Sequence, residues 1–129
     1  MITPELIVAL TIYFEAGGES AYGRLCVASV LYNRATRDQV PPAHVALEYR
    51  QFECWNTRSP ETTMLTEPET QSEAWKECRV LAVALSLGRF KPVDNWTHFY
   101  NPKVSTPPWA PELRNTCIVG KHRFGRIGP

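Results

Sequence analysis

One short segment places a candidate proton donor beside aromatic side chains. In Tyr13-Phe14-Glu15-Ala16-Gly17-Gly18-Glu19, Glu15 falls at the expected end of a helix. The negative end of a helix disfavours a carboxylate, and apolar neighbours that pack over it disfavour the anion further. Both effects raise the pKa of a carboxyl group, as a general acid requires. Glu15 is therefore the candidate catalytic acid, and the alternative is a solvated glutamate at a helix end.

Glu19 lies four residues after Glu15, so the two carboxyl groups share a helical face only if one helix runs through both glycines. A shared face would make them an acid–base pair of the kind that cleaves glycosides. Two adjacent glycines favour a break instead, and Glu19 would then favour the start of the next helix. Both interpretations of Glu19 stay open on spacing alone.

A second segment, Trp96-Thr97-His98-Phe99-Tyr100-Asn101-Pro102, has the character of a short strand. An extended chain puts alternate side chains on opposite faces. The two expected sets are Trp96, His98 and Tyr100 on one face, and Thr97, Phe99 and Asn101 on the other. Aromatic rings stack on sugars, and imidazole and amide groups hydrogen-bond to N-acetyl groups. The segment is a candidate glycan-binding rim, and the alternative is an ordinary half-buried strand.

Two further places mix aromatic and amide side chains. Arg50-Gln51-Phe52-Glu53-Cys54-Trp55-Asn56 offers Gln51 and Trp55 as contact residues, and Trp109 lies in a proline-rich loop. Both tryptophans can equally be packing residues. A nucleophile pair of Cys54 and His98 has no support from their spacing.

No metal or cofactor is expected. The other histidines, His44 and His122, are not at ligand spacing from His98, and no Cys-x-x-Cys pair is present. The sequence also lacks a phosphate-binding glycine loop, G-x-S-x-G and H-E-x-x-H. Two disulfides among the four cysteines would have three connectivities, and the sequence does not choose between them. The cysteines are Cys26, Cys54, Cys78 and Cys117.

The elements that must position these residues are mostly helical. Capping residues and apolar spacing predict helices from Thr3-Pro4-Glu5 to Gly17, from Ser20 to about Arg37, over 43–48, and from about Pro68 to a stop at Gly88. Extended pieces are expected at 51–55, 94–100 and 118–124, and loops at 56–66 and 102–111. The expected fold is mainly α, an α+β arrangement with minor strands, in a single domain over 1–129.

Composition limits the function classes. The chain has 129 residues, 43% of them hydrophobic and 21% charged, so it is globular rather than disordered. Its 14 basic and 13 acidic residues give a net charge of +1, which argues against nucleic-acid binding. The apolar stretch 6–14 is too short for stable membrane insertion. No signal peptide is expected, because no basic region and no small-residue cleavage site open the chain.

Taken together, the segments resemble the SleB/CwlJ-type cell wall hydrolases, the spore-cortex-lytic family that also includes phage endolysins. The matching residues run in order across nearly the whole chain. They are 11–19, Gly23 with 27–34, Gln51-Phe52 with Trp55, 97–102, Trp109 and 119–124. One departure is Gly17, where the family usually has arginine.

The resemblance implies a lysozyme-like, mostly helical fold that cleaves the β-1,4 bond between N-acetylmuramic acid and N-acetylglucosamine in peptidoglycan. Glu15 matches the family's catalytic glutamate, which acts as both acid and base in a lytic transglycosylase without a second carboxylate or a metal. The residues expected to bind the glycan strand are Glu19, Gln51, Trp55, His98, Tyr100, Asn101 and Trp109.

Three alternatives stay open. A muramidase would use water and a second carboxylate, Glu19 or Asp94. A non-catalytic glycan-binding module would keep the aromatic rim, and a Cys/His enzyme would cut the peptide stems. The expected setting is a monomeric phage endolysin made in the host cytoplasm, released through a holin-type pore and acting on the bacterial cell wall.

Overall fold

Within residues 2–48 and 52–129, which the computed structural model describes, five α-helices are accompanied by a small antiparallel sheet. The helices are α1 (Pro4–Ala16), α2 (Ala21–Asp38), α3 (Pro42–Ala46), α4 (Glu67–Gln71) and α5 (Glu73–Ser86). The strands are β1 (His98–Tyr100), β2 (Arg114–Val119) and β3 (His122–Arg126). Single 3₁₀ turns cover Glu53–Trp55, Pro60–Thr62 and Ala110–Glu112. The predicted class, mainly helical with minor strands, is confirmed.

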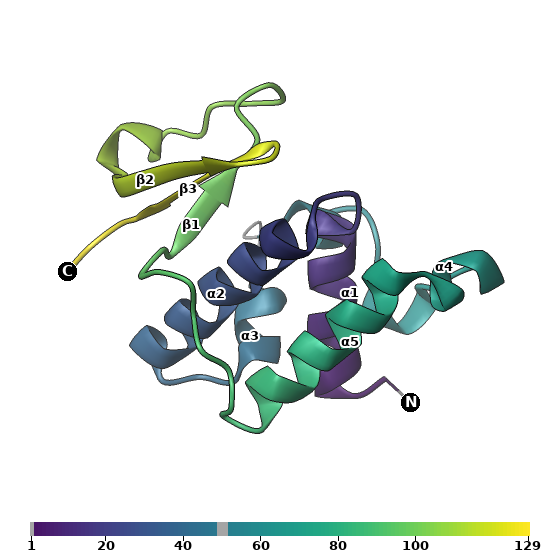
Figure 1. The fold of residues 1–129 in the computed structure, drawn as a ribbon. Helices are drawn as coiled ribbons and strands as arrows, with labels where there is room; N and C mark the ends of the chain where they lie inside the picture. The colour runs from purple at the N-terminus through teal and green to yellow at the C-terminus, as the bar shows by residue number, and fades with distance from the viewer. Residues whose placement is uncertain (1, 49–51) are drawn as a thin grey trace.

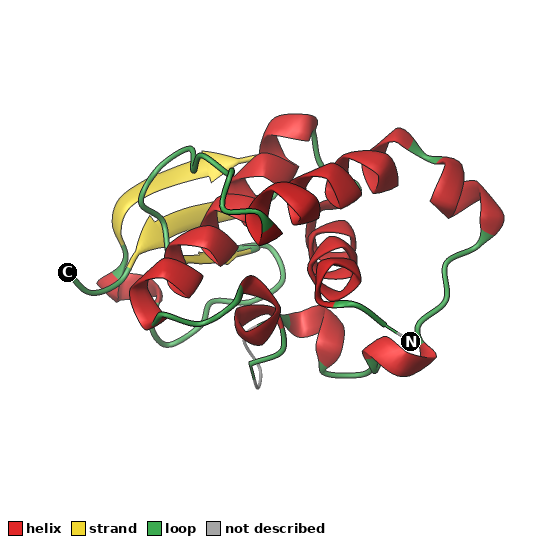
Figure 2. Ribbon diagram, turned by 90° about the horizontal axis from the view of Figure 1, so that it is seen from below, coloured by secondary structure: helices red, strands yellow, loops and turns green. Residues whose placement is uncertain are grey.

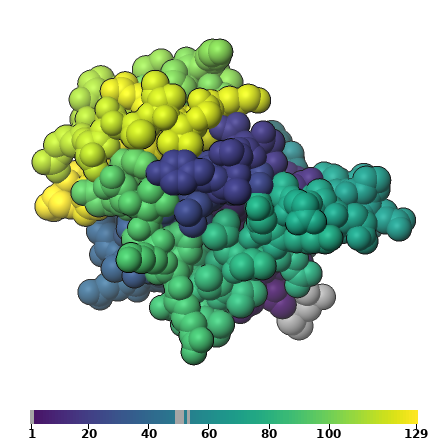
Figure 3. Space-filling model, in the orientation of Figure 1, coloured from purple at the N-terminus to yellow at the C-terminus, as the bar shows by residue number. Residues whose placement is uncertain are grey.

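The helices pack together and the sheet stands at one end of them, beside α2 (Figures 1 and 2). Helix α1 contacts α2, α3 and α5, and six of its residues are buried, so it runs through the core. In the space-filling view the C-terminal strands, in yellow, lie directly against α2, in dark blue (Figure 3). One hydrophobic core includes residues of the helices together with Trp96 and Phe124 from the sheet region.

The predicted helix starts are confirmed by their caps. The Thr3 side chain accepts a hydrogen bond from Leu6 N at 3.1 Å, and the Ser20 side chain accepts one from Gly23 N at 3.1 Å. The helix predicted from Pro68 is two helices, because Ser72 has an extended backbone between them and caps α5 through Trp75 N. Gly88 ends the α5 region with a φ of +67°, as predicted.

One extended prediction is wrong, and a second is confirmed except at a turn. The segment 51–55 is a 3₁₀ turn in its described part, closed by Trp55 N donating to Phe52 O at 3.1 Å. Its aromatic pattern reflects the burial of Phe52, and Gln51 lies outside the described residues. The segment 118–124 is the end of β2, a turn at Gly120 (φ +59°) and the start of β3. The strand order is β1-β3-β2, all antiparallel.

The strand predicted over 94–100 is confirmed only for residues 98–100. The preceding backbone is bound to α2, because the Asn33 side chain donates to Asp94 O and to Trp96 O, each at 2.8 Å. Trp96 therefore does not share a face with His98. Its ring lies 5.1 Å from Phe124, the cross-strand partner of Phe99, so Trp96 packs on the opposite side of the sheet from the predicted one.

Arg24, near the start of α2, holds the junction between α1 and α2. The residue is 8% exposed. Its Nη1 donates to Gly17 O at 3.3 Å and to Glu19 O at 2.5 Å, and its Nε donates to Glu77 Oε2 at 2.9 Å. A cation at this place also complements the negative end of α1. The turn that follows the candidate acid is thus fixed by a side chain from another helix.

Replacing Arg24 by Met is expected to lower the free energy of unfolding by about 2 kcal/mol. Removing one partner of a buried pair costs more than that, but Glu77 is 41% exposed and water then solvates its carboxylate. Chemical denaturation monitored by circular dichroism measures the change. The control is Lys76→Ala, which breaks the exposed 3.7 Å pair with Glu73 and should leave stability unchanged. Equal effects from the two variants would contradict the role of Arg24.

Candidate active site

A cleft of about 370 Å³ lies between the end of α1 and the sheet. It is bounded by Asn56, which follows the first 3₁₀ turn, by β1 with its following loop, and by the start of β3. Its lining combines aromatic rings, an imidazole, amides, two hydroxyls and one carboxylate. The lining residues are Phe14, Glu15, Asn56, Phe99, Tyr100, Asn101, Val104, Ser105, Pro107, Trp109 and His122. This composition suits a ligand with both apolar ring faces and polar substituents.

Glu15 lies on the last turn of α1 and is half-buried. The helix ends directly after it, where Gly17 N donates to Tyr13 O at 2.7 Å. Its Oε2 accepts a hydrogen bond from Cys54 N at 3.3 Å, which ties it to the first 3₁₀ turn. Within the described part of the lining, Glu15 supplies the one carboxylate.

The cleft brings Glu15 together with three of the residues expected to bind glycan, namely Tyr100, Asn101 and Trp109. The Trp109 ring stands edge-on to Tyr100, with centroids 5.7 Å apart. The Tyr100 hydroxyl accepts a hydrogen bond from Arg123 Nη1 at 3.2 Å. The proline-rich loop therefore folds its tryptophan back onto β1, and the three side chains form one wall of the cleft.

His98 supports this wall without being among its described lining residues. Its ring centroid lies 4.9 Å from that of Trp109, and its Nδ1 is 2.8 Å from Thr97 Oγ1. Burial, with smaller effects from Arg34 and Arg37, lowers the pKa of His98 to about 4. The imidazole is therefore neutral at neutral pH, and it packs edge-on against Trp109.

Glu19 and Trp55 lie beside the cleft rather than among its described lining residues. The Glu19 side chain is 9% exposed, and its Oε1 accepts a hydrogen bond from Lys121 N at 2.8 Å, in the turn between β2 and β3. The Trp55 Nε1 donates to Thr11 Oγ1 at 2.8 Å, and its ring stands edge-on to Phe14 at 6.1 Å. Glycan contact by these two side chains stays a prediction, as it does for Gln51, which lies outside the described residues.

Three polar lining residues were not singled out from the sequence. Asn56 ends the aromatic and amide segment 50–56, and His122 lies in the segment 119–124 that carries the resemblance, so a sequence pattern pointed to both. No sequence pattern pointed to Ser105, because nothing in a proline-rich loop indicates which hydroxyl turns toward a cleft.

Asp94, the other candidate for a second carboxylate, has a structural partner. Its Oδ1 accepts a hydrogen bond from Asn115 Nδ2 at 2.8 Å, and it is exposed. Among the described residues no group of three or more His, Cys, Asp or Glu could hold a metal ion. The four cysteines are free, with Cys117 exposed and Cys26, Cys54 and Cys78 buried.

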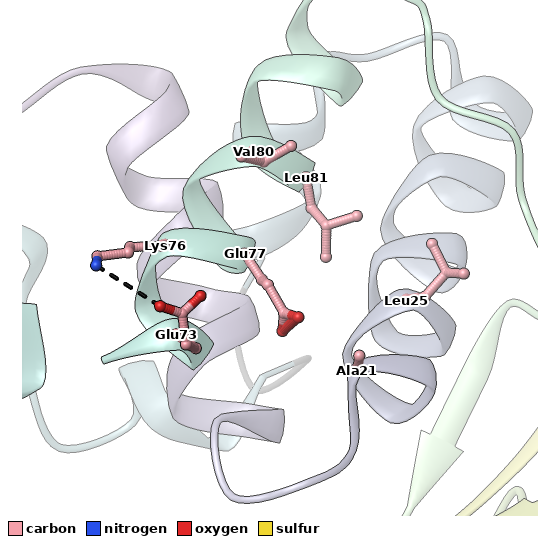
Figure 4. A pocket seen from close by; sticks show the side chains of 7 residues that line it. All are labelled: Ala21, Leu25, Glu73, Lys76, Glu77, Val80 and Leu81. Carbon is pink, nitrogen blue, oxygen red and sulfur yellow. Dashed lines mark ion pairs between the residues drawn. The ribbon is translucent and has the colours of Figure 1, made fainter. Parts of the chain in front are cut away.

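A second hollow, of about 410 Å³, lies between α2 and α5 and contains no comparable set of groups (Figure 4). Its walls are mostly aliphatic, with Leu25 and Leu81 on either side. Its two described carboxylates are already paired, Glu77 with Arg24 and Glu73 with Lys76. The cleft beside Glu15 is therefore the candidate active site.

Residues 18–125 match the Cell Wall Hydrolase family, and the protein belongs to that family. The match begins after Glu15, so the role of Glu15 depends on the geometry of the cleft. Two curated relatives from Bacillus cereus, both named spore cortex-lytic enzyme, are 28% identical over 120 residues. The alignment covers 92% of this chain but 42% of each relative, so the chain spans less than half of their length.

Two solved structures share the fold. One is the catalytic domain of the germination-specific lytic transglycosylase SleB from Bacillus anthracis, with a TM-score of 0.68 at 23% identity over 98% of this chain and 97% of that one. The other is the catalytic domain of the Bacillus cereus SleB protein, with a TM-score of 0.69 at 26% identity over 95% and 89%. The predicted resemblance and the lysozyme-like fold are confirmed. No helix in the described ranges is long and apolar enough to cross a membrane.

Replacing Trp109 by Ala is expected to weaken glycan binding about tenfold while changing the melting temperature little. The ring is half-buried and lies on the cleft wall, so its loss removes contact area for a ligand more than core packing. Titration with an N-acetylglucosamine oligomer and thermal unfolding measure the two effects. The core variant Phe124→Ala is the control for a large stability loss. A drop for Trp109→Ala as large as that of the control would make this ring a core residue.

The burial of His98 predicts that stability falls in weak acid. The unfolded chain protonates this histidine near pH 6.5, whereas the native protein does so only near its pKa of about 4. The stabilisation is present above pH 6.5 and is lost as the pH falls toward 4. His98→Gln should flatten the fall of melting temperature over this range. The control is Tyr100→Phe, which removes no group that titrates between these pH values. An unchanged slope of melting temperature against pH in His98→Gln would contradict the prediction.

Proposed function

We propose that the protein cleaves the β-1,4 bond between N-acetylmuramic acid and N-acetylglucosamine in peptidoglycan, as a lytic transglycosylase. The observation that carries the proposal is the single described carboxylate, Glu15, in a cleft lined by aromatic and amide side chains. The family and the fold support it. The B. anthracis structure is that of a protein named a lytic transglycosylase.

In the first step Glu15, as the acid, gives its proton to the glycosidic oxygen. The bond from that oxygen to C1 of the muramic acid breaks, and positive charge develops on the sugar ring. In the second step the Glu15 carboxylate takes the proton of the same sugar's 6-hydroxyl, whose oxygen bonds to C1. The products are a 1,6-anhydro end and a free hydroxyl on the leaving sugar, and Glu15 is protonated again.

The setting of Glu15 suits a group that alternates between the two forms. The last turn of α1 disfavours its anion, while the N–H of Cys54 donates to Oε2 and stabilises the carboxylate after proton transfer. The raised pKa expected for Glu15 stays a prediction, which the acidic and basic limbs of a pH–rate profile would test.

The rival muramidase needs a second carboxylate to activate water. Its two candidates have other partners in the structure. The Glu19 carboxylate accepts a hydrogen bond from Lys121 N, and the Asp94 carboxylate accepts one from the Asn115 side chain. Neither belongs to the described lining of the cleft. These placements favour the reaction that uses one carboxyl group.

A Cys54 nucleophile is disfavoured by its surroundings. Burial, and then the neighbouring Glu15 carboxylate, raise the pKa of the Cys54 thiol well above its usual range. A thiolate is the reactive form, and a thiol with a raised pKa rarely provides it. One of the two ring nitrogens of His98, Nδ1, lies 2.8 Å from Thr97 Oγ1.

Mass spectrometry of the soluble products from purified peptidoglycan tests the proposal. The wild type should release anhydro-muropeptides, and Glu15→Gln should lose on the order of 10² to 10⁴ in rate, because the amide fits the site but carries no acidic proton. Circular dichroism confirms that the variant is folded. Glu67→Gln, an exposed change on α4, is the matched control and should keep full activity.

Each other outcome would change the assignment. Reducing ends from the wild type would replace transglycosylation by hydrolysis, and full activity in a folded Glu15→Gln would refute Glu15. Sugar binding without products at any pH would establish the glycan-binding module.

Several expectations about the setting of the protein stay predictions. They are the single domain, the monomeric state, synthesis in a host cytoplasm and the role of a phage endolysin released through a holin-type pore. The names of the similar Bacillus proteins instead refer to the spore cortex and to germination.

A further inference from the structure

Glu19 and His122 meet behind the wall of the cleft, at the contact between the α1–α2 turn and the start of β3. Their side chains are 9% and 10% exposed. The Glu19 Oε1 lies 3.9 Å from His122 Nδ1 and accepts the hydrogen bond from Lys121 N at 2.8 Å. The carboxylate is therefore held in place by the main chain of the hairpin and faces the imidazole.

The His122 ring spans the distance between Glu19 and the cleft. Its Nδ1 is buried and has no hydrogen-bond partner among the described residues, although Glu19 is the group next to it. The ring stands edge-on to Phe99, with centroids 4.9 Å apart, and to Phe124 at 6.0 Å. His122 also lines the cleft that contains Glu15. With Nδ1 on the Glu19 side, Nε2 is the nitrogen available to a ligand in the cleft.

The turn between β2 and β3 is shaped for this contact. Gly120 has a φ of +59°, which favours glycine. A Cβ at this position would lie 2.2 Å from Glu19 Oε1, so any larger residue would displace the carboxylate. Backbone conformation and close approach thus both require glycine where the hairpin receives Glu19.

We propose that Glu19 is a positioning residue that keeps the proton of His122 on Nδ1, and that His122 Nε2 accepts a hydrogen bond from a hydroxyl or N-acetyl N–H of the glycan. The pair deepens the proposed function and rests on it for the identity of the substrate. It also gives Glu19 a role in substrate binding that acts through His122 rather than by contact.

The charges around the ring are consistent with an acceptor at neutral pH. Burial lowers the pKa of His122, Glu19 opposes this and Lys121 adds to it. The other titratable groups on the described cleft wall are Glu15 and Tyr100. A neutral imidazole with its proton on Nδ1 has a lone pair on Nε2, whereas a protonated ring has none.

Long-range ¹H–¹⁵N correlation of the histidine rings tests the positioning role directly. The wild type should show the Nδ1–H tautomer for His122, and Glu19→Gln should shift it toward Nε2–H. The glutamine oxygen can still accept from Lys121 N at the place of Oε1, while the negative charge that favours a proton on Nδ1 is lost. A role limited to holding the hairpin would leave the tautomer unchanged, and an Nε2–H tautomer in the wild type would overturn the proposal.

Binding of an N-acetylglucosamine tetramer tests the acceptor. His122→Phe keeps an aromatic ring against Phe99 but has no nitrogen, and should weaken binding about 3- to 10-fold, as expected for one hydrogen bond. Glu19→Gln should have a similar effect, and the double variant should add little to either. Glu67→Gln is the control. Unchanged affinity in folded His122→Phe, or additive effects in the double variant, would overturn the pair.

Kinetics on peptidoglycan separate this proposal from the proposed function. The two variants should raise KM by the same factor and leave kcat within about twofold, whereas Glu15→Gln should lose kcat and keep its affinity. If the wild type makes no product, the proposed function fails, while the tautomer and the tetramer affinities still decide the role of Glu19 and His122.

Discussion

The guanidinium of Arg24 lies at the junction of α1 and α2, where it donates to two main-chain oxygens, Gly17 O and Glu19 O, and to the carboxylate of Glu77. At the end of α1, Tyr13 O accepts from Gly17 N and Ala16 O accepts from Glu19 N. Arg24 supplies donors from α2 to the next carbonyls, in the turn itself. Its contact with Glu77 also ties the junction to α5, so three helices meet at the turn that directly follows Glu15.

The aromatic wall of the cleft is positioned by the same α1–α2 turn. Glu19 lies in this turn and accepts the hydrogen bond of Lys121 N, and this contact fixes the β2–β3 hairpin relative to α1. The hairpin carries β1 by antiparallel pairing, and β1 with its following loop provides Tyr100 and Trp109. The distance from the acid to the aromatic wall is therefore set by a short path through the α1–α2 turn. A small shift of that turn would move both walls.

The sequence predicted well what depends on local chemistry. The caps at Thr3 and Ser20 and the position of Glu15 at a helix end follow from residues within one turn. The errors lie where distant contacts override local preference. Trp96 alternates as a strand residue should, yet Asn33 of α2 binds its main-chain carbonyl, and its ring packs against Phe124 on the face opposite the predicted one. No local pattern contains the information that an amide some sixty residues earlier takes those carbonyls.

The departure at Gly17 has a structural counterpart. A Cβ at this position would lie 2.4 Å from Tyr13 O, so the backbone here has closed to a form that suits glycine. Arg24 provides a cation at the turn, but it is buried and binds main-chain oxygens, which keeps it away from a ligand. Arg58 is different, since it is exposed and its guanidinium lies 4.0 Å above the ring of Phe14, a lining residue of the cleft. In this chain Arg24 provides positive charge at the turn and Arg58 provides it above Phe14, and neither is at position 17.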